Sequence, residues 1–441
     1  MFINSNAFRL ERFIKHVFSV NINHVNIFAI VILSVILLQF LLDLVSNLLN
    51  LRALKLEPPE VLEDVFSPAT YRKSQQYLRE TTQFNLLVSS FGLALLLAFW
   101  FLGGFNWLYL FISNRELGSV ISGLLYTGTL MAGYGIIMLP YSIYGTFVIE
   151  QRYGFNKTTP ATFIADRVKG LLLAAVLGGP ILACIFAIFE LAGPNAWLFC
   201  WAAVTGYVLV IEFIAPNWIM PLFNKFTPLE DGDLRTAILG YAASVDFPVQ
   251  NLFVIDGSRR SSKSNAFFIG FGRNKRIALF DTLITRHTIP ELVAVLAHEI
   301  GHYKKKHIIW GMVISILHFG LLFFLLSLFI NNPLLYQAFY VQQPSVYTGL
   351  IFFGLLYTPA EFLLSILMSM LSRKFEYDAD RFAAQTIPDP SAMTAALKKL
   401  SADNLSNLTP HPFFVFLHYS HPPLLQRMKA IKSAVDTNGS L

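Results

Sequence analysis

The chain has 441 residues, of which 55% are hydrophobic and only 14% are charged, and its formal net charge is +6. About a quarter of the residues in an ordinary soluble domain are charged, so this composition argues for a protein embedded in lipid. The basic residues are scattered and no nucleic-acid fold signature is present, so nucleic acid is not expected as a partner.

Seven apolar runs are long enough to cross a bilayer, whose core about 30 Å thick needs roughly 20 helical residues. They are Ile27–Leu49, Leu86–Phe105, Val120–Ile149, Leu171–Phe189, Trp197–Ile214, Ile308–Ile330 and Tyr347–Leu371. They lack the short polar–apolar alternation of barrel strands, so each is predicted to be a helix. The expected class is an all-α multi-pass membrane protein.

Two polar intervals lie outside these runs and predict a small α+β domain. The first, about 217–307, contains a helical pattern at Leu234–Val245 and a helix starting near Pro290. Between them, three short strands are predicted at Leu252–Ile255, Asn265–Gly270 and Arg276–Phe280. We expect membrane regions at 1–216 (five spans) and 308–371 (two spans), and the two parts of one polar domain at 217–307 and 372–441.

The distribution of basic residues predicts the orientation in the membrane. The loop between the sixth and seventh runs, Asn331–Val346, has no Lys or Arg, whereas the loop after the third run has Arg152, Lys157, Arg167 and Lys169. The positive-inside rule therefore places both polar intervals in the cytoplasm. Seven spans then leave the N-terminus outside, although it carries Arg9, Arg12 and Lys15.

The strongest chemical motif is His-Glu-Ile-Gly-His at 298–302. On a helix, positions i and i+4 lie about 40° apart, so His298 and His302 face one way and suit two ligands of a tetrahedral Zn²⁺. Glu299, one residue away, can reach a metal-bound water and act as its general base. A helix that is otherwise apolar would not carry these groups without a reason.

A third zinc ligand is expected just after the seventh run, in Phe375–Asp380. Glu376 and Asp380 are four residues apart and share a helix face, so one can bind metal while the other orients a ligand histidine. The spacing leaves open which does which, and also allows a solvated acidic cluster. His307 follows His302 by five residues, which predicts that it faces away from the ligands. His318, within the sixth run, has no assigned role.

A further segment, His418-Tyr-Ser-His-Pro-Pro-Leu-Leu-Gln-Arg427, holds a histidine directly before two prolines. Such a histidine is held in a rigid extended turn and could stabilise an oxyanion. From the residues alone, an ordinary polar turn is the simpler interpretation.

Together these motifs resemble one family. Seven spans, HEIGH at 298–302, FEYDAD at 375–380 and HYSHPPLLQR at 418–427 occur in the order typical of the type I CAAX prenyl proteases. These are membrane zinc endopeptidases that mature prenylated substrates such as a-factor and prelamin A. The stretch Ser264–Phe268 also looks like the strand of that family that lines the substrate.

The resemblance implies a complete site. One zinc ion per chain would be held by His298, His302 and Glu376, and Glu299 would be the base. Asp380 would support a ligand residue from behind. His421 would stabilise the transition state, and Arg427 would help to position the site. The peptide backbone would pair with Asn265, Ala266 and Phe267 by strand addition.

The resemblance also implies that the helices enclose a large intramembrane chamber with the zinc site at its cytoplasmic end. Charged groups in lipid are costly, so acids within or beside the apolar runs are expected to face this chamber. They are Asp43, Glu190, Glu212 and Glu361.

Two features depart from animal and fungal members of the family. The loop Asn331–Val346 is short, and the C-terminus has no Lys-rich retrieval signal. We therefore expect a bacterial member in the inner membrane, or an endoplasmic reticulum protein if the source is eukaryotic. A bacterial member would cleave membrane or misfolded proteins as well as, or instead of, prenylated ones.

Two other functions are considered. A heat-shock-type membrane zinc protease without a prenyl substrate shares HExxH and a later Glu, but has a shorter chain and fewer spans. The intramembrane acids would fit a transporter or channel with structural zinc. Two features argue against it: the sequence has no internal repeat, and a structural zinc site would not need Glu299. A site-two-type protease is disfavoured because the motif precedes the sixth span.

Overall fold

The computed structural model describes the chain except for residues 1–25, 56, 248, 250–251, 270–275 and 439–441. Seven helical segments within the described residues are long and apolar enough to span a membrane, as expected. They are Ile27–Arg52, Pro68–Phe101, Ser119–Glu150, Pro160–Leu191, Gly193–Leu222, His307–Phe329 and Val346–Thr386. The N-terminal basic residues lie outside the described residues.

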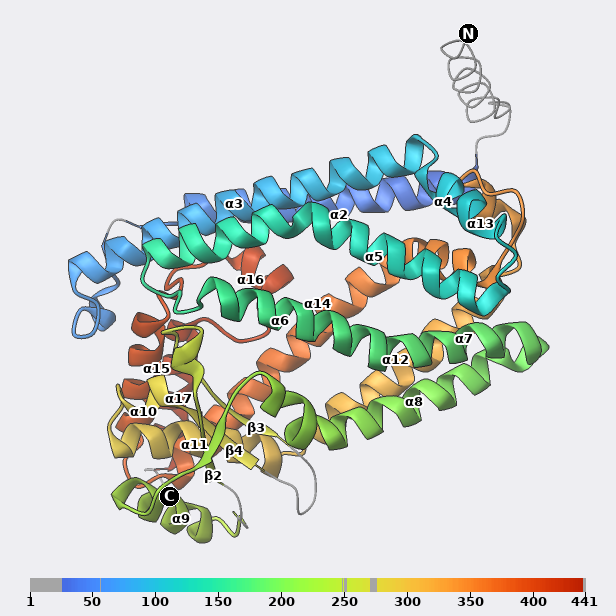
Figure 1. Cartoon of the computed structure of the whole chain (residues 1–441). Coiled ribbons are helices and arrows are strands. Elements are labelled where there is room, and N and C mark those ends of the chain that lie inside the picture. The colour runs from blue at the N-terminus through green and yellow to red at the C-terminus, as the bar shows by residue number, and fades with distance from the viewer. Residues whose placement is uncertain (1–25, 56, 248, 250–251, 270–275, 439–441) are drawn as a thin grey trace.

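The segments correspond to the labelled helices of Figure 1, some of them joined by π-helical turns. They are α2 (Ile27–Arg52), α3 (Pro68–Phe101), α5 (Ser119–Tyr144), α6 (Pro160–Leu173) with α7 (Gly179–Leu191), α8 (Ala196–Ile214), α12 (His307–Phe329) and α14 (Val346–Thr386). Two short helices, α4 (Gly104–Ser113) and α13 (Pro333–Gln337), cover the end of the bundle farthest from the sheet.

Polar caps decide where the membrane helices begin. The side chain of Asn26 accepts hydrogen bonds from the backbone N–H groups of Phe28 and Ala29, and Ser67 and Thr159 cap α3 and α6. The second span was expected at Leu86–Phe105 but forms a helix from Pro68 to Phe101. It starts earlier because a helix continues past the apolar run into water, and it ends earlier because Gly103 has a φ of 74°.

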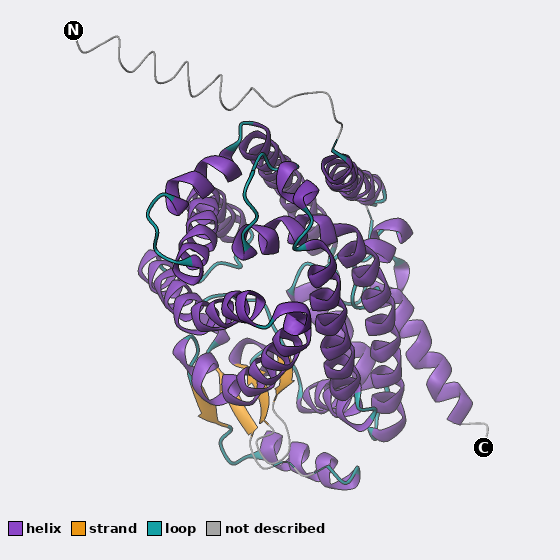
Figure 2. Ribbon diagram, turned by 90° about the vertical axis from the view of Figure 1, so that its right-hand side faces the viewer, coloured by secondary structure: helices purple, strands orange, loops and turns teal. Residues whose placement is uncertain are grey.

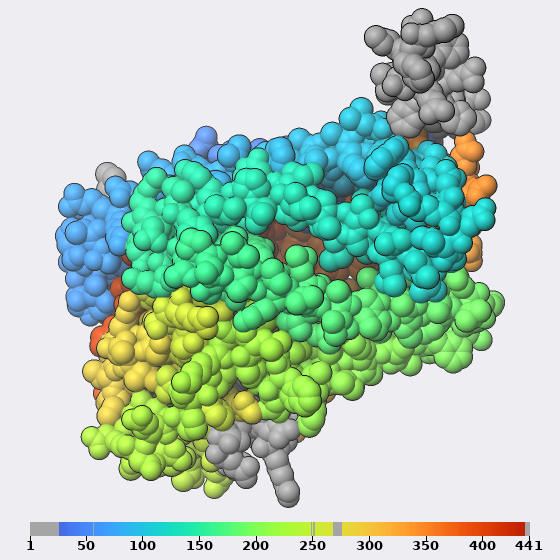
Figure 3. All heavy atoms as spheres, in the orientation of Figure 1, coloured from blue at the N-terminus to red at the C-terminus, as the bar shows by residue number. Residues whose placement is uncertain are grey.

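The bundle is hollow rather than close-packed throughout. Figure 3 shows an opening between α5 and the α6–α7 segment, and α14 is visible at its base. Buried packing is concentrated at the α4–α13 end, where the Trp100 ring stacks on Phe339 and its Nε1 donates to the Ala338 carbonyl at 2.7 Å. The expected membrane class with helices around a chamber is confirmed.

One helix joins the membrane bundle to the polar domain. The 41 residues of α14 start among the membrane helices and end beside α11 (Ile289–Lys304) and α17 (Leu424–Asn438). In Figure 1, α14 runs diagonally from the α13 end of the bundle to the sheet. A single continuous helix therefore carries Glu376 and Asp380 out of the bundle and into the polar domain.

The sheet is small and lies at the base of the bundle (Figure 2). Its order is β1 (Phe226–Pro228), β2 (Leu252–Ile255), β4 (Arg276–Phe280), β3 (Ala266–Ile269), with only β2 and β4 parallel. The three expected strands are present, and β1 is an additional one. Because β3 is an edge strand, one side of its backbone is available to another chain.

The polar intervals share one hydrophobic core. It joins residues of α9 (Asp233–Ser244), α11, α15 (Ser391–Asp403) and α17 with β2, β4 and α10 (Asp281–Ile284). Leu62 and Phe66, from the connection between the first two spans, and Tyr71, from the first turn of α3, are buried in the same core. The short helix α16 (Pro412–His418) packs against α2 and α14.

Candidate metal centre and active site

The helix α11 carries His298, Glu299 and His302, and its start is firmly fixed. Thr288 and Glu291 form a capping box in which the Thr288 backbone N–H donates to Glu291 Oε2 at 2.8 Å. Lys399 holds the same carboxylate at 2.7 Å. The apolar residues Leu292–Ala297 are all buried, so the helix cannot rotate without exposing its core face.

Three ligand-type atoms converge between α11 and α14. His298 Nε2 and His302 Nε2 are 3.1 Å apart, and the Glu376 oxygens lie 3.4 Å and 3.3 Å from these two nitrogens. Bonds of about 2.0–2.1 Å in a tetrahedron place neighbouring ligand atoms about 3.3 Å apart. The two histidine nitrogens and the Glu376 carboxylate therefore lie close enough together to hold one Zn²⁺.

Glu376 has the electrostatics of an ionised ligand. Its side chain is 5% exposed, and Oε2 has no hydrogen-bond partner among the described residues. Burial raises the pKa of Glu376, but contacts with His298 and His302 outweigh it and hold the pKa well below its usual range. A buried carboxylate with an oxygen that accepts no hydrogen bond fits a metal ligand, since a buried polar atom without such a bond is otherwise costly.

Asp380 lies behind the histidine rather than beside the ligand atoms. Its Oδ1 is 2.9 Å from Nδ1 of His298, the ring nitrogen that points away from Glu376. A carboxylate in this position keeps the proton on Nδ1 and leaves Nε2 as a lone-pair donor. Glu376 therefore meets His298 at Nε2, and Asp380 meets it at Nδ1.

His307 contacts the site, and the expectation that it faces away is wrong. Its Nδ1 is 3.0 Å from Nδ1 of His302, and its ring stacks on Phe375 with centroids 4.1 Å apart. The expectation assumed a continuous helix, but Lys306 has a φ of 59° and redirects the chain. Burial lowers the pKa of His307 to about 4, so its neutral ring can accept the Nδ1 hydrogen of His302.

The segment 418–427 closes the opposite side. Arg427, on α17, donates from Nε and Nη2 to the two oxygens of Asp380 and has Nη1 3.6 Å from Glu376 Oε2. His421 has Nε2 3.3 Å from Glu376 Oε1, while its side chain is 66% exposed. Both residues therefore reach Glu376 from outside α11 and α14.

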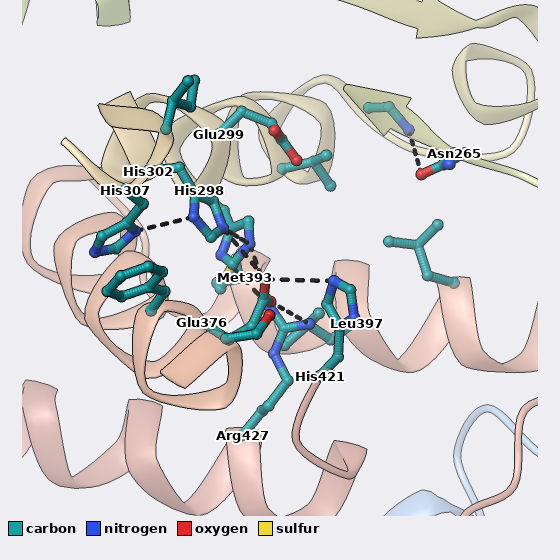
Figure 4. A pocket seen from close by; sticks show the side chains of 16 residues that line it. Asn265, His298, Glu299, His302, His307, Glu376, Met393, Leu397, His421 and Arg427 are labelled. Carbon is teal, nitrogen blue, oxygen red and sulfur yellow. Dashed lines mark hydrogen bonds and ion pairs between the residues drawn. The ribbon is translucent and has the colours of Figure 1, made fainter. Parts of the chain in front are cut away.

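These groups open onto one cavity of about 470 Å³ (Figure 4). Glu299, Asn265, Ala266, His421 and Arg427 line it together with the histidines. Phe267 is absent from the lining, and its ring instead contacts Phe280 with centroids 5.9 Å apart. The cavity can thus hold a peptide bond between the edge strand and the ligand atoms.

One wall of the cavity was not anticipated. Met393, Leu397 and Leu400 of α15 also line it. Their spacing of four and three residues places them on one helix face. This periodicity was the sequence signal that could have indicated an apolar wall. The wall gives the cavity an apolar half that suits a hydrophobic part of a substrate.

His318 and Glu361 lie within membrane helices, away from this cavity. Nε2 of His318 is 3.1 Å from Oε2 of Glu361, which joins α12 to α14. This contact explains a polar residue in the sixth span. That Glu361 and the other intramembrane acids face the chamber stays a prediction.

A hollow bundle of membrane helices with an HExxH helix and a glutamate from α14 at its base defines an integral membrane zinc metalloendopeptidase. Comparison with known families agrees. Residues 47–225 match the CAAX prenyl protease N-terminal model, described as five membrane helices, and residues 228–435 match Peptidase family M48.

Individual relatives extend over most of the chain. A CAAX prenyl protease 1 homolog of Oryza sativa subsp. japonica is 37% identical over 91% of this chain and 97% of its own. CAAX prenyl protease 1 of Saccharomyces cerevisiae is 36% identical over 85% of this chain and 88% of its own. The crystal structure of S. mikatae Ste24p has a TM-score of 0.87 and 34% identity, covering 92% and 99% of the two chains. The chain belongs to the CAAX prenyl protease 1 family.

Proposed function

We propose that this endopeptidase hydrolyses peptide bonds near the C-terminus of prenylated proteins at the cytoplasmic face of its membrane. The observation that carries the proposal is the convergence of ligand atoms from His298, His302 and Glu376 in the lining of a cavity that an edge strand also lines. The names of the relatives support the substrate class, and the apolar α15 wall suits a hydrophobic substrate.

His298, His302 and Glu376 would hold one zinc ion per chain, and no other cluster of this kind is found among the described residues. When bound, zinc supplies Lewis acidity at the scissile carbonyl and makes water more acidic. Asp380 orients His298, and His307 orients His302, each through Nδ1. Arg427 balances the two buried carboxylates.

Glu299 lines the cavity one residue from His298, where its carboxylate can take a proton from water and pass it to the leaving amine. In Figure 4, Glu299 is drawn on the side of His298 that faces Asn265, where the substrate is expected. His421 reaches the site from the opposite wall and can donate to the oxyanion of the tetrahedral state.

The substrate backbone would add to the free edge of β3. Asn265 and Ala266 line the cavity directly, and Phe267 continues the same strand. Strand addition uses main-chain hydrogen bonds, so it holds peptides of varied sequence and leaves selectivity to the cavity walls.

The localisation is proposed from charge. The basic loops lie on the side of the zinc site, so this side is cytoplasmic, and residues 217–307 and 372–441 together form the protease domain. The short loop Asn331–Val346 favours a bacterial inner membrane, and in a eukaryotic cell the expected membrane is the endoplasmic reticulum.

The substrate class is tested with a matched pair of peptides, one farnesylated on its CAAX cysteine and one identical but unprenylated. Faster zinc-dependent cleavage of the farnesylated peptide by the purified protein is expected. Equal cleavage of both would favour a quality-control protease without a prenyl requirement. Zinc binding with cleavage of neither would favour structural zinc in a transporter.

A further inference from the structure

We propose that the first membrane helix, α2, positions His421 for catalysis through a hydrogen-bonded contact between Ser46, Asp43 and His418. The inference rests on the proposed role of His421 and assigns three positioning residues to it. None of the three lines the metal cavity.

The contact begins with a polar face on an otherwise apolar helix. Asp43, Ser46, Asn47 and Asn50 are spaced by three, four and seven residues, so they share one side of α2. Ser46 and Asn50 are fully buried. Polar groups in a membrane helix are costly unless they are paired, so this face must be matched by partners from elsewhere in the chain.

The partners come from the segment just before His421. His418 Nε2 lies 2.8 Å from Ser46 Oγ and 3.4 Å from Asp43 Oδ1. Farther along the same face, Asn50 Oδ1 accepts from the His411 backbone N–H and from Asn407 Nδ2, both at 3.1 Å. Both ends of α16 are therefore fastened to α2, which lies beside it in Figure 1.

The direction of the hydrogen bond between His418 and Ser46 follows from the other hydrogen bond of the Ser46 hydroxyl. Ser46 has one hydroxyl hydrogen, and its Oγ donates to the Asp43 carbonyl at 2.8 Å. His418 must then be the donor, with its hydrogen on Nε2 pointing at Ser46 and Asp43. Burial lowers the pKa of His418 more than Asp43 raises it, which is consistent with a neutral ring.

His421 depends on such an anchor because its own contacts are few. Its side chain is two-thirds exposed, and it meets Ser420 Oγ at 3.0 Å and Glu376. Downstream, Pro422 and Pro423 are buried and rigid. Upstream, Arg373 donates to the carbonyls of Val415 and Tyr419. The loop is thus clamped at both ends, and α2 supplies the part of the upstream clamp that lies closest to the membrane.

The expected signature is a loss in turnover without a loss in binding. A misplacement of about 1 Å at a reacting group can cost up to about 100-fold in rate. We expect Ser46→Ala and His418→Leu to lower kcat about 10-fold with KM and zinc content unchanged. His418→Gln places an amide N–H near the position of Nε2 and should recover most of the rate.

The test combines these variants with His421→Ala in a double-mutant cycle on the full-length protein. Ser89→Ala is the matched control, because the Ser89 hydroxyl bonds only to its own helix. If α2 acts through His421, Ser46→Ala and His418→Leu cause no further loss in the His421→Ala background. Zinc content and thermal unfolding of every variant are measured alongside, and Ser46→Ala carries the test if His418→Leu does not fold.

Equal losses in both backgrounds, or a change in KM alone, would overturn the inference while leaving the proposed function intact. A His421→Ala protein as active as the wild type would overturn the role of His421 and this inference with it. A wild-type protein that shows no zinc-dependent cleavage would instead overturn the proposed function.

Discussion

Arg427 grips Asp380 with two parallel hydrogen bonds, from Nε to Oδ2 at 2.8 Å and from Nη2 to Oδ1 at 2.6 Å. Both side chains are nearly inaccessible to solvent. The pair joins α17 to α14 and stands directly behind His298, so the fold at this point and the metal centre depend on the same contact.

Removing the guanidinium should damage both. Arg427→Gln leaves the buried carboxylates of Asp380 and Glu376 unbalanced, at a cost of about 3–5 kcal/mol. Arg427→Lys keeps the charge but cannot reproduce the fork, so it should rescue only part of this loss. Thermal unfolding in detergent would measure the effect, with the exposed Arg381→Gln as control. An Arg427→Gln protein as stable as the wild type would contradict this account.

Glu376 and Asp380 should differ sharply in their effect on the metal. Glu376→Gln removes an anionic ligand, and we expect the purified protein to contain little zinc. Asp380→Asn removes only the support of His298, so zinc should still bind with about 10–100-fold lower affinity. Metal analysis and competition with a chelator distinguish the two, and Asp378→Asn on the same helix should behave as wild type. Equal zinc loss in both variants would mean that their roles are not separate.

The edge strand should control substrate binding. Ala266 lies in β3 and lines the cavity, so Ala266→Leu narrows the space in which a peptide would add to the sheet. KM is expected to rise about 10-fold or more, with a smaller change in kcat and no change in zinc content, as one methylene-scale clash costs about 1–3 kcal/mol. Thr227→Leu, on the opposite edge strand β1, is the control. An unchanged KM would argue against strand addition at β3.

The start of α11 should give a pH-dependent contribution to stability. Burial raises the pKa of Glu291, but Lys399 and the Thr288 N–H outweigh it, so the net pKa is lowered. A lowered carboxyl pKa stabilises the folded state above the ordinary glutamate value of about 4.3 and loses this effect as pH falls below it.

Glu291→Gln should therefore lower the unfolding temperature at pH 7, by an amount equivalent to about 1 kcal/mol. The difference from wild type should shrink as the pH is lowered below about 4.3. The exposed Glu230→Gln serves as control. A difference that stays constant with pH would show that the charge of Glu291 is not the stabilising feature.

Periodicity and motif spacing predict elements that depend only on residues close together in the sequence. The seven spans, the helix around His298 and the strands at Leu252–Ile255 and Arg276–Phe280 each follow from the residues within them. The ends of the spans do not follow from these residues, because α14 continues for more than a turn beyond its apolar run. Hydropathy reports where lipid ends, not where the helix ends.

Contacts between segments far apart in the sequence could not be predicted from local sequence patterns. The position of His307 depends on the backbone of Lys306, whose positive φ no pattern indicated. The strand β1 has three residues, including Pro228, and forms only because β2 is next to it. The proposed division of roles between Glu376 and Asp380 rests on a contact that no pattern indicated, since His298 presents a different nitrogen to each.

The central claim is that Glu299 acts as the base at a zinc site formed by His298, His302 and Glu376. The most direct test compares cleavage of a farnesylated CAAX peptide by wild-type protein and by Glu299→Ala, with zinc content measured in both and a chelator-treated sample as control. We predict that Glu299→Ala retains zinc and loses at least about 100-fold in kcat, and that chelation abolishes wild-type cleavage. A zinc-loaded Glu299→Ala protein as active as the wild type would contradict the mechanism.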